Sequence, residues 1–163
     1  YNGKKEGTLY KSFGTNLRMT EIQAVIGRCM LKKLPLWLEK RRKHALIFNS
    51  IFKNNDKLRI TVPPDYIYHA YYKYYVFIKG SKKQRNMIID LLKDDVNIFY
   101  GSTPELYKED VFKDFFVKEC CNAKRLGEAS LMFMCDHTIK KEETIRTAMK
   151  VSQVVKKVFR INI

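Results

Sequence analysis

The sequence SFGTNLRMTEIQAVIG occupies residues 12–27 and joins a polar loop to the start of a helix. Gly14 and Asn16 are turn formers, and Gly14 can adopt a positive φ without steric cost. Thr20 followed by Gln23 has the spacing of a capping box, which predicts a helix that begins at residue 21. Apolar side chains then recur at helical spacing, at Ile22, Val25, Ile26, Cys29 and Met30. This pattern predicts a buried helix face, with Asn16 and Arg18 held on the loop before it.

Composition places the chain among folded, water-soluble proteins. It has 163 residues, of which 45% are hydrophobic and 30% are charged, enough for one domain with a core. No run of about 18 apolar residues occurs, so we expect no membrane span. The chain begins at Tyr1 without a signal-like apolar segment, and we expect it to be part of a longer, cytoplasmic product.

The formal net charge of +15 is large. A charge of this size is typical of proteins that bind nucleic acid, anionic lipid or phosphate. Lysines are nevertheless spread along the whole chain beside acids, so a solvated surface is the favoured interpretation and nucleic acid an unlikely partner. The basic run 40–43 is likewise interpreted as the solvated face of a helix.

The four cysteines do not form the pattern of a zinc site. Cys120 and Cys121 are adjacent, which suits neither a simple bridge nor a metal knuckle. Cys29 and Cys135 lie in apolar runs. We therefore expect buried, reduced thiols in a cytoplasmic protein and no metal ligands.

Periodicity predicts the order of the elements. Helices are expected over residues 21–34, 36–52, 85–93, 122–129 and 141–159, and strands over 58–62, 71–78, 96–100 and 131–135. Pro35 is expected to interrupt the first helix or to open the second. Residues 104–119 are typical of short helix and loop. The order indicates an α+β fold, a small, mostly antiparallel sheet with covering helices, divided into a lead-in and site loop (1–18) and one domain (19–163).

Four segments, in order, resemble the DegT/StrS family of PLP-dependent sugar aminotransferases. They are FGTNLRMTEIQAVIG (13–27), HAYYKYYVF (69–77), PELYKE (104–109) and LGEASLMF (126–133). The resemblance implies the C-terminal small domain of a fold-type I PLP aminotransferase. Such an enzyme would aminate a nucleotide-linked keto sugar, with glutamate as amino donor, for surface polysaccharide, and would act as a homodimer. The family's Schiff-base lysine motif is not found in this sequence, so the chain alone is expected to be inactive.

The resemblance also implies site residues. Asn16 matches an asparagine that reaches the PLP phosphate of the partner subunit, and an amide N–H is a suitable donor for phosphate oxygen. Arg18 matches a position near the substrate, where a guanidinium suits a diphosphate or carboxylate. Tyr107 matches a region of substrate-side contacts. The alternatives are a structural turn for Asn16, an ion pair with Glu21 for Arg18, and packing on Phe112 for Tyr107. No catalytic residue is expected in the chain.

Two features point away from a complete site. His69 alone is interpreted as a structural, hydrogen-bonding residue. Asp136-His137-Thr138 stands where relatives tend to have His-Pro-Thr, so the histidine is displaced by one position and a site role for it would be lost. An ordinary loop change explains the same observation. The alternative functions are a non-catalytic basic binding domain, a remnant domain of a split gene, and a PLP-dependent dehydratase.

Overall fold

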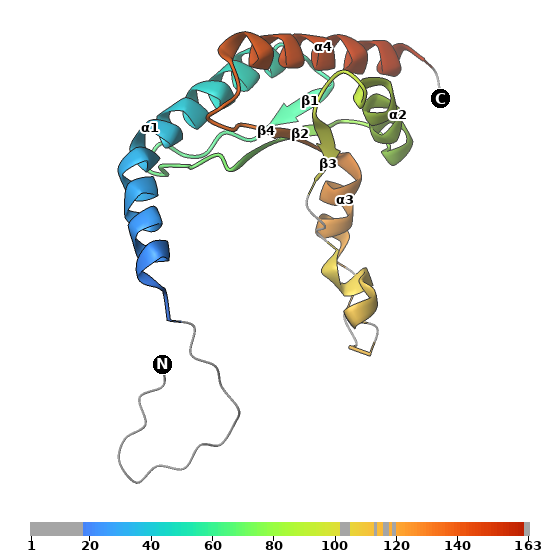
Figure 1. Cartoon of the computed structure of the whole chain (residues 1–163). Helices are drawn as coiled ribbons and strands as arrows, with labels where there is room; N and C mark the ends of the chain where they lie inside the picture. The colour runs from blue at the N-terminus through green and yellow to red at the C-terminus, as the bar shows by residue number, and fades with distance from the viewer. Residues whose placement is uncertain (1–17, 102–104, 113, 116–117, 119, 162–163) are drawn as a thin grey trace. The chain divides into compact units, whose positions relative to one another are not determined.

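A computed structural model describes residues 18–101, 105–112, 114–115, 118 and 120–161 (Figure 1). The chain separates into two compact units, Tyr1–Pro35 and Leu36–Ile163. The helices are α1 (Glu21–Phe52), α2 (Lys82–Leu92), α3 (Cys121–Ala129) and α4 (Lys141–Arg160). The strands are β1 (Leu58–Ile60), β2 (Lys73–Ile78), β3 (Ile98–Tyr100) and β4 (Ser130–Met134), with short 3₁₀ turns at Leu106–Lys108 and Asp110–Phe112.

The four strands form one antiparallel sheet in the order β1-β2-β4-β3. The central pair, β2 and β4, is in register with Tyr74 opposite Phe133 and Val76 opposite Leu131. Burial alternates along β2, so that Tyr74, Val76 and Ile78 point to the same, covered side. The α+β fold with a small antiparallel sheet, predicted from the order of the elements, is confirmed.

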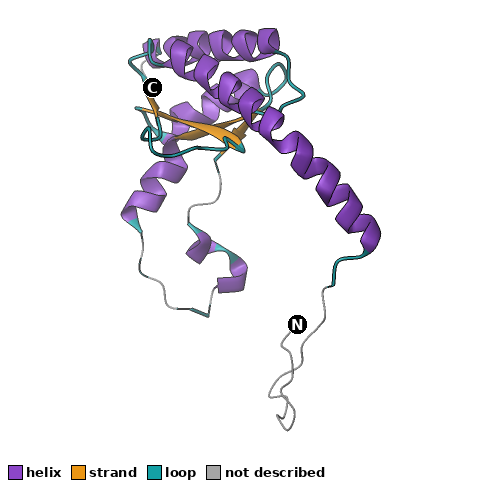
Figure 2. Ribbon diagram, turned by 90° about the vertical axis from the view of Figure 1, so that its left-hand side faces the viewer, coloured by secondary structure: helices purple, strands orange, loops and turns teal. Residues whose placement is uncertain are grey.

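Helix α4 and the Leu36–Phe52 part of α1 cover one face of this sheet (Figures 1 and 2). Phe48 lies at the centre of the contact. Its ring centroid is 4.8 Å from that of Tyr74, 5.3 Å from that of Phe133 and 5.5 Å from that of Phe52. Such offset ring pairs add to the free energy of apolar burial, so this aromatic cluster is the centre of the core.

The predicted break at Pro35 is wrong, because α1 is a single helix from Glu21 to Phe52 with Pro35 inside it. An internal proline removes one backbone N–H and crowds a carbonyl, at a cost of about 3 kcal/mol. The flanking residues 31–34 and 36–40 are rich in leucine and lysine, which have high helix propensity. The buried side chains of Ala45, Phe48 and Phe52 hold the second half of the same helix in the core.

The apolar face at the start of α1 is exposed, contrary to the prediction that it is buried. Ile22 is 74% exposed and Val25 59%, within the Tyr1–Pro35 unit. Amphipathic spacing shows that a helix face requires an apolar partner, but it does not show which molecule provides it. The capping box is confirmed, since the N–H of Gln23 donates to the hydroxyl of Thr20 and the N–H of Thr20 donates to the side chain of Gln23.

The cysteines are all free, but only one of the four is buried. Burial raises the pKa of Cys135 to about 12, so this thiol stays protonated. Cys29, Cys120 and Cys121 are exposed, which corrects the prediction of buried thiols at these positions. Among the described helices, none combines the length and the apolar character that crossing a bilayer requires.

Candidate functional site

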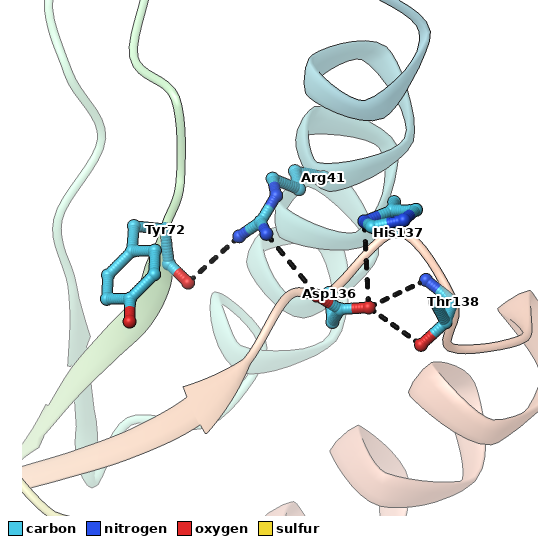
Figure 3. A network of polar contacts seen from close by, with 5 residues as sticks. All are labelled: Arg41, Tyr72, Asp136, His137 and Thr138. Atoms are coloured by element: carbon cyan, nitrogen blue, oxygen red, sulfur yellow. Dashed lines mark hydrogen bonds and ion pairs between the residues drawn. The ribbon is translucent and has the colours of Figure 1, made fainter. Parts of the chain in front are cut away.

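Asp136 connects three segments of the chain just beyond the end of β4 (Figure 3). Its Oδ2 atom accepts a hydrogen bond from Arg41 Nη2 at 3.3 Å. Its Oδ1 atom accepts two from Thr138, one from the backbone N–H at 2.9 Å and one from the hydroxyl at 2.7 Å. Arg41 Nη1 also donates to the carbonyl oxygen of Tyr72, 3.1 Å away and just before β2. The carboxylate and the guanidinium thereby fix α1, the entry to β2 and the exit from β4 to one another.

These contacts favour the ionised form of Asp136. Its pKa is lowered, first by the hydrogen bonds from Thr138 and to a smaller extent by electrostatic interaction with His137 and Arg41. The ring of His137 stacks on Trp37, with centroids 4.4 Å apart and planes 22° apart. Both residues of the Asp136-His137 pair therefore have local structural contacts, as an ordinary loop change would require.

The entry to β2 contains a residue with unusual backbone geometry. Tyr71 has a φ of 45°, in the left-handed region that a bulky side chain rarely adopts. Its backbone N–H donates to Nδ1 of His69 at 3.0 Å, and the two rings meet edge to face at 4.3 Å. Because Nδ1 is the acceptor, neutral His69 carries its proton on Nε2. The ring of Tyr71 packs on Tyr74 and the core, which offsets the strain.

A hollow of about 250 Å³ lies beside this turn, and we call it the aromatic hollow. Its lining includes His69, Tyr71, Lys73, Tyr75 and Phe77, and no carboxylate is among the lining residues. Tyrosine and phenylalanine faces can stack on a planar or sugar ring, while His69 and Lys73 can donate hydrogen bonds. The hollow can therefore bind a polar ring, but it offers no carboxylate to that ligand.

The basic run 40–43 does more than form a solvated surface. Arg41 and Arg42 are half-buried, and Arg42 Nη1 donates to the carbonyl oxygen of His69 at 3.1 Å. The guanidinium of Arg42 also lies 4.2 Å from the ring centroid of Tyr68. The two arginines thus hold the segment that leads into β2, a role that the sequence analysis missed. The only sequence signal was arginine rather than lysine at the two central positions of the run.

The structure describes two of the three predicted site residues, Arg18 and Tyr107. Asn16 lies outside the described residues. Arg18 is exposed just before α1, in the Tyr1–Pro35 unit, whereas Tyr107 belongs to the Leu36–Ile163 unit. The Tyr107 hydroxyl donates to Oε1 of Glu105 at 2.7 Å, and Lys108 Nζ lies 2.7 Å from the same oxygen. The hydrogen bond to Glu105 raises the pKa of Tyr107, so this phenol is a neutral donor at ordinary pH.

None of the lysines in the described ranges is buried. A Schiff-base lysine reacts as a free amine and is commonly desolvated. The buried polar residues in the described ranges are His44, Asn55, Arg85, Ser130 and Thr144, with no lysine among them. The same part of the chain contains no group of three His, Cys, Asp or Glu side chains able to hold a metal ion.

Comparison with known proteins places this chain among aminotransferases. A curated relative, the UDP-4-amino-4,6-dideoxy-N-acetyl-beta-L-altrosamine transaminase of Helicobacter pylori, is 47% identical over 45 residues, 28% of this chain and 12% of that protein. The aminotransferase from Psychrobacter cryohalolentis superposes with a TM-score of 0.75 at 32% identity and covers 96% of this chain. A Streptococcus pneumoniae structure in its PLP form gives a TM-score of 0.78 at 21% identity over 86% of this chain, a likeness of fold alone.

The chain spans less than half the length of these relatives: 44% of the Psychrobacter protein and 36% of the Streptococcus protein. The family profile described as "DegT/DnrJ/EryC1/StrS aminotransferase family" matches residues 1–152, nearly the whole sequence. Since this match extends across both units and the sheet, the chain belongs to the DegT/DnrJ/EryC1/StrS aminotransferase family.

Proposed function

We propose that this chain is the C-terminal small domain of a PLP-dependent aminotransferase that aminates a nucleotide-linked keto sugar. The family match over residues 1–152 carries this proposal, together with the fact that the chain spans 44% of the Psychrobacter aminotransferase. The 45-residue match to a transaminase of a UDP-linked amino sugar supports the substrate class. Glutamate is the proposed amino donor. The reaction would take place in the cytoplasm, and the amino sugar formed would be used to make surface polysaccharide.

A large domain outside this chain would supply the Schiff-base lysine and the acid that faces the pyridine nitrogen. No lysine is buried in the part of the chain that the structure describes, which agrees with this division of labour. When bound, PLP supplies the electron sink that transamination requires. The exposed apolar face around Ile22 and Val25 is suited to packing on that large domain.

Asn16 and Arg18 are the residues by which this chain would contribute to the site. The amide of Asn16 would donate to the PLP phosphate of the partner subunit in a homodimer. The guanidinium of Arg18 would bind the diphosphate of the nucleotide sugar or the carboxylate of glutamate, and either ligand can accept two parallel hydrogen bonds. Both residues precede α1, whose first turn is fixed by the capping box of Thr20 and Gln23.

Tyr107 is the proposed substrate-side contact from the other unit. Its hydroxyl is oriented by Glu105, which is itself paired with Lys108. A phenol held in this way can exchange its carboxylate partner for a sugar hydroxyl without changing its protonation state. Its contribution would be to orient the substrate.

The test compares this chain with the full-length protein that contains it. We expect the full-length protein to show absorbance of bound PLP that borohydride alters irreversibly, and to transfer the amino group of glutamate to a nucleotide-linked keto sugar. The chain alone should do neither. In the full-length protein, Asn16→Ala should weaken PLP retention, while Asn97→Ala, at an exposed position beyond α2, should leave it unchanged.

A second comparison tests Arg18. Arg18→Lys should raise the KM for the nucleotide sugar or for glutamate by about tenfold, because a point charge replaces a two-pronged donor. A full-length protein that fails to bind PLP contradicts the proposal. In that case a non-catalytic basic domain becomes the better interpretation.

A further inference from the structure

A second hollow, of about 590 Å³, lies within the Leu36–Ile163 unit, and we call it the basic hollow. Its walls are the middle of α1, the loop after β4 and the first turn of α4. It is larger than the aromatic hollow and falls within the size range of small-molecule sites.

The charge of this hollow is strongly unbalanced. Four lysines line it, at positions 40, 43, 140 and 141, and the only acid in the lining is Glu142. Lys43 is paired with Glu39 at 2.6 Å. In the described part of the chain, no carboxylate lies within ion-pair distance of Lys40, Lys140 or Lys141. Ammonium groups that line one hollow repel each other, and a bound anion would reduce that repulsion.

The remaining lining gives the ligand a second property. Leu46, Ile47 and Ile139 add apolar surface to the same lining, and Leu46 is 64% exposed. An inorganic ion alone would leave these side chains in water. A ligand that joins an anionic group to a short carbon skeleton would satisfy both the lysines and the apolar lining.

The start of α4 adds a smaller contribution. Lys140 occupies the N-cap position of α4, and its side chain makes no capping hydrogen bond. It therefore accepts none of the backbone N–H groups of the first turn. Glu142 and Glu143 already complement the helix dipole there. The lysines and the volume of the hollow, not the helix end, are therefore what select an anion.

Nucleic acid fits this hollow less well than a small ligand does. Proteins that bind single strands combine basic grooves with several aromatic stacking platforms. Three tyrosines and Phe77 line the aromatic hollow, while no tyrosine, phenylalanine or tryptophan lines the basic one. We propose that the basic hollow binds a small organic phosphate, with the phosphate among Lys40, Lys140 and Lys141 and the carbon skeleton against Leu46 and Ile47.

The single tryptophan of the chain provides a direct readout. Trp37 stacks on His137, and His137 lines the basic hollow. Butyl phosphate titrated into the purified chain should change the fluorescence of Trp37 in a saturable way. Inorganic phosphate should bind more weakly, because it leaves the apolar lining uncovered. Leu46→Ser should abolish most of the difference between the two probes.

Charge-reversal pairs supply the matched control. The double variant Lys140→Glu/Lys141→Glu should bind butyl phosphate about tenfold or more weakly than the parent. The double variant Lys156→Glu/Lys157→Glu changes the net charge by the same amount at the far end of α4. It should weaken the binding of butyl phosphate by less than about threefold. Circular dichroism would verify that both variants fold.

Three outcomes would overturn the proposal. One is the absence of a saturable change in Trp37 fluorescence with butyl phosphate. Another is an equal loss of affinity in the two charge-reversal variants, which would show attraction by net charge alone. The third is stronger binding of a short single-stranded oligonucleotide than of butyl phosphate, with that binding lost only in the Lys140/Lys141 variant, which would make the hollow a nucleic-acid site.

Discussion

Replacement of Asp136 by alanine tests whether its network holds the fold together. The change removes an ion pair to Arg41 at 3.3 Å and two hydrogen bonds from Thr138. The side chains of Arg41 and Asp136 are 18% and 28% exposed, so water can replace part of the lost contacts. We assign about 1 kcal/mol to the ion pair and about 1 kcal/mol to the backbone N–H of Thr138, whose hydroxyl can turn to solvent. Asp136→Ala should therefore lower the free energy of unfolding by about 2 kcal/mol.

The pH dependence of this penalty gives a second check. The fold lowers the pKa of Asp136 below its ordinary 3.8. Its stabilising contribution is therefore complete well above that value and is lost as the pH falls through the folded-state pKa. The difference between the parent and Asp136→Ala should shrink towards about pH 2 and stay constant between about pH 6 and 8.

Urea unfolding at neutral pH, followed by circular dichroism, is the assay, and the m-values of parent and variants should agree. Asp90→Ala is the control, because Asp90 and Lys93 form an exposed ion pair whose loss should cost less than about 0.5 kcal/mol. A double-mutant cycle with Arg41→Met isolates the pair and should give a coupling of about 1 kcal/mol. Equal effects of Asp136→Ala and Asp90→Ala, or a coupling near zero, would refute the reasoning.

Three further predictions concern the core, a buried histidine and a helix cap. Phe48→Ala should lower the free energy of unfolding in urea by about 3–5 kcal/mol. Phe99 is 45% exposed, so the control Phe99→Ala should lower it by less than about 1 kcal/mol. Similar losses in the two variants would show that the aromatic cluster is not the centre of the core. Burial lowers the pKa of His44 below 6.5, so the free energy of unfolding should decline as the pH falls below about 6.5, by up to about 1.4 kcal/mol per pH unit. A His44→Gln variant whose stability declines with pH as steeply as the parent's would contradict this. Ser81 and Gln84 form a capping box at the start of α2, so Ser81→Ala should lower the free energy of unfolding by about 1 kcal/mol, and an unchanged urea midpoint would exclude a stabilising cap.

The sequence predicted the sheet well because its strands carry local signals. β2 has β-branched and aromatic residues and is half-buried, so both its propensity and its alternation are visible in the chain itself. Turn formers at Gly80-Ser81 separate it from α2 in the same local way. A small sheet covered by helices can adopt only a few strand arrangements, and the antiparallel pairing of β2 with β4 is one of them.

The candidate site was less predictable, because its contacts join residues far apart in the sequence. Nothing near Arg41 indicates that its guanidinium reaches both Asp136 and the carbonyl of Tyr72. The left-handed geometry of Tyr71 is equally invisible, since a tyrosine has no propensity for it and only tertiary packing stabilises it. The helical continuity through Pro35 was missed for a different reason: a local rule about proline takes no account of the tertiary packing that holds α1 through Phe48 and Phe52.

The strand order β1-β2-β4-β3 also constrains how the chain acquires its structure during synthesis. β1 and β2 are close in sequence and can pair early, whereas the other edge of β2 waits for β4, which lies beyond α2, β3 and α3. Until the ribosome has delivered Met134, β2 presents a row of unpaired backbone groups next to aromatic side chains. We therefore expect the nascent chain to be prone to aggregation in the interval between the emergence of residue 78 and that of residue 134 from the ribosome.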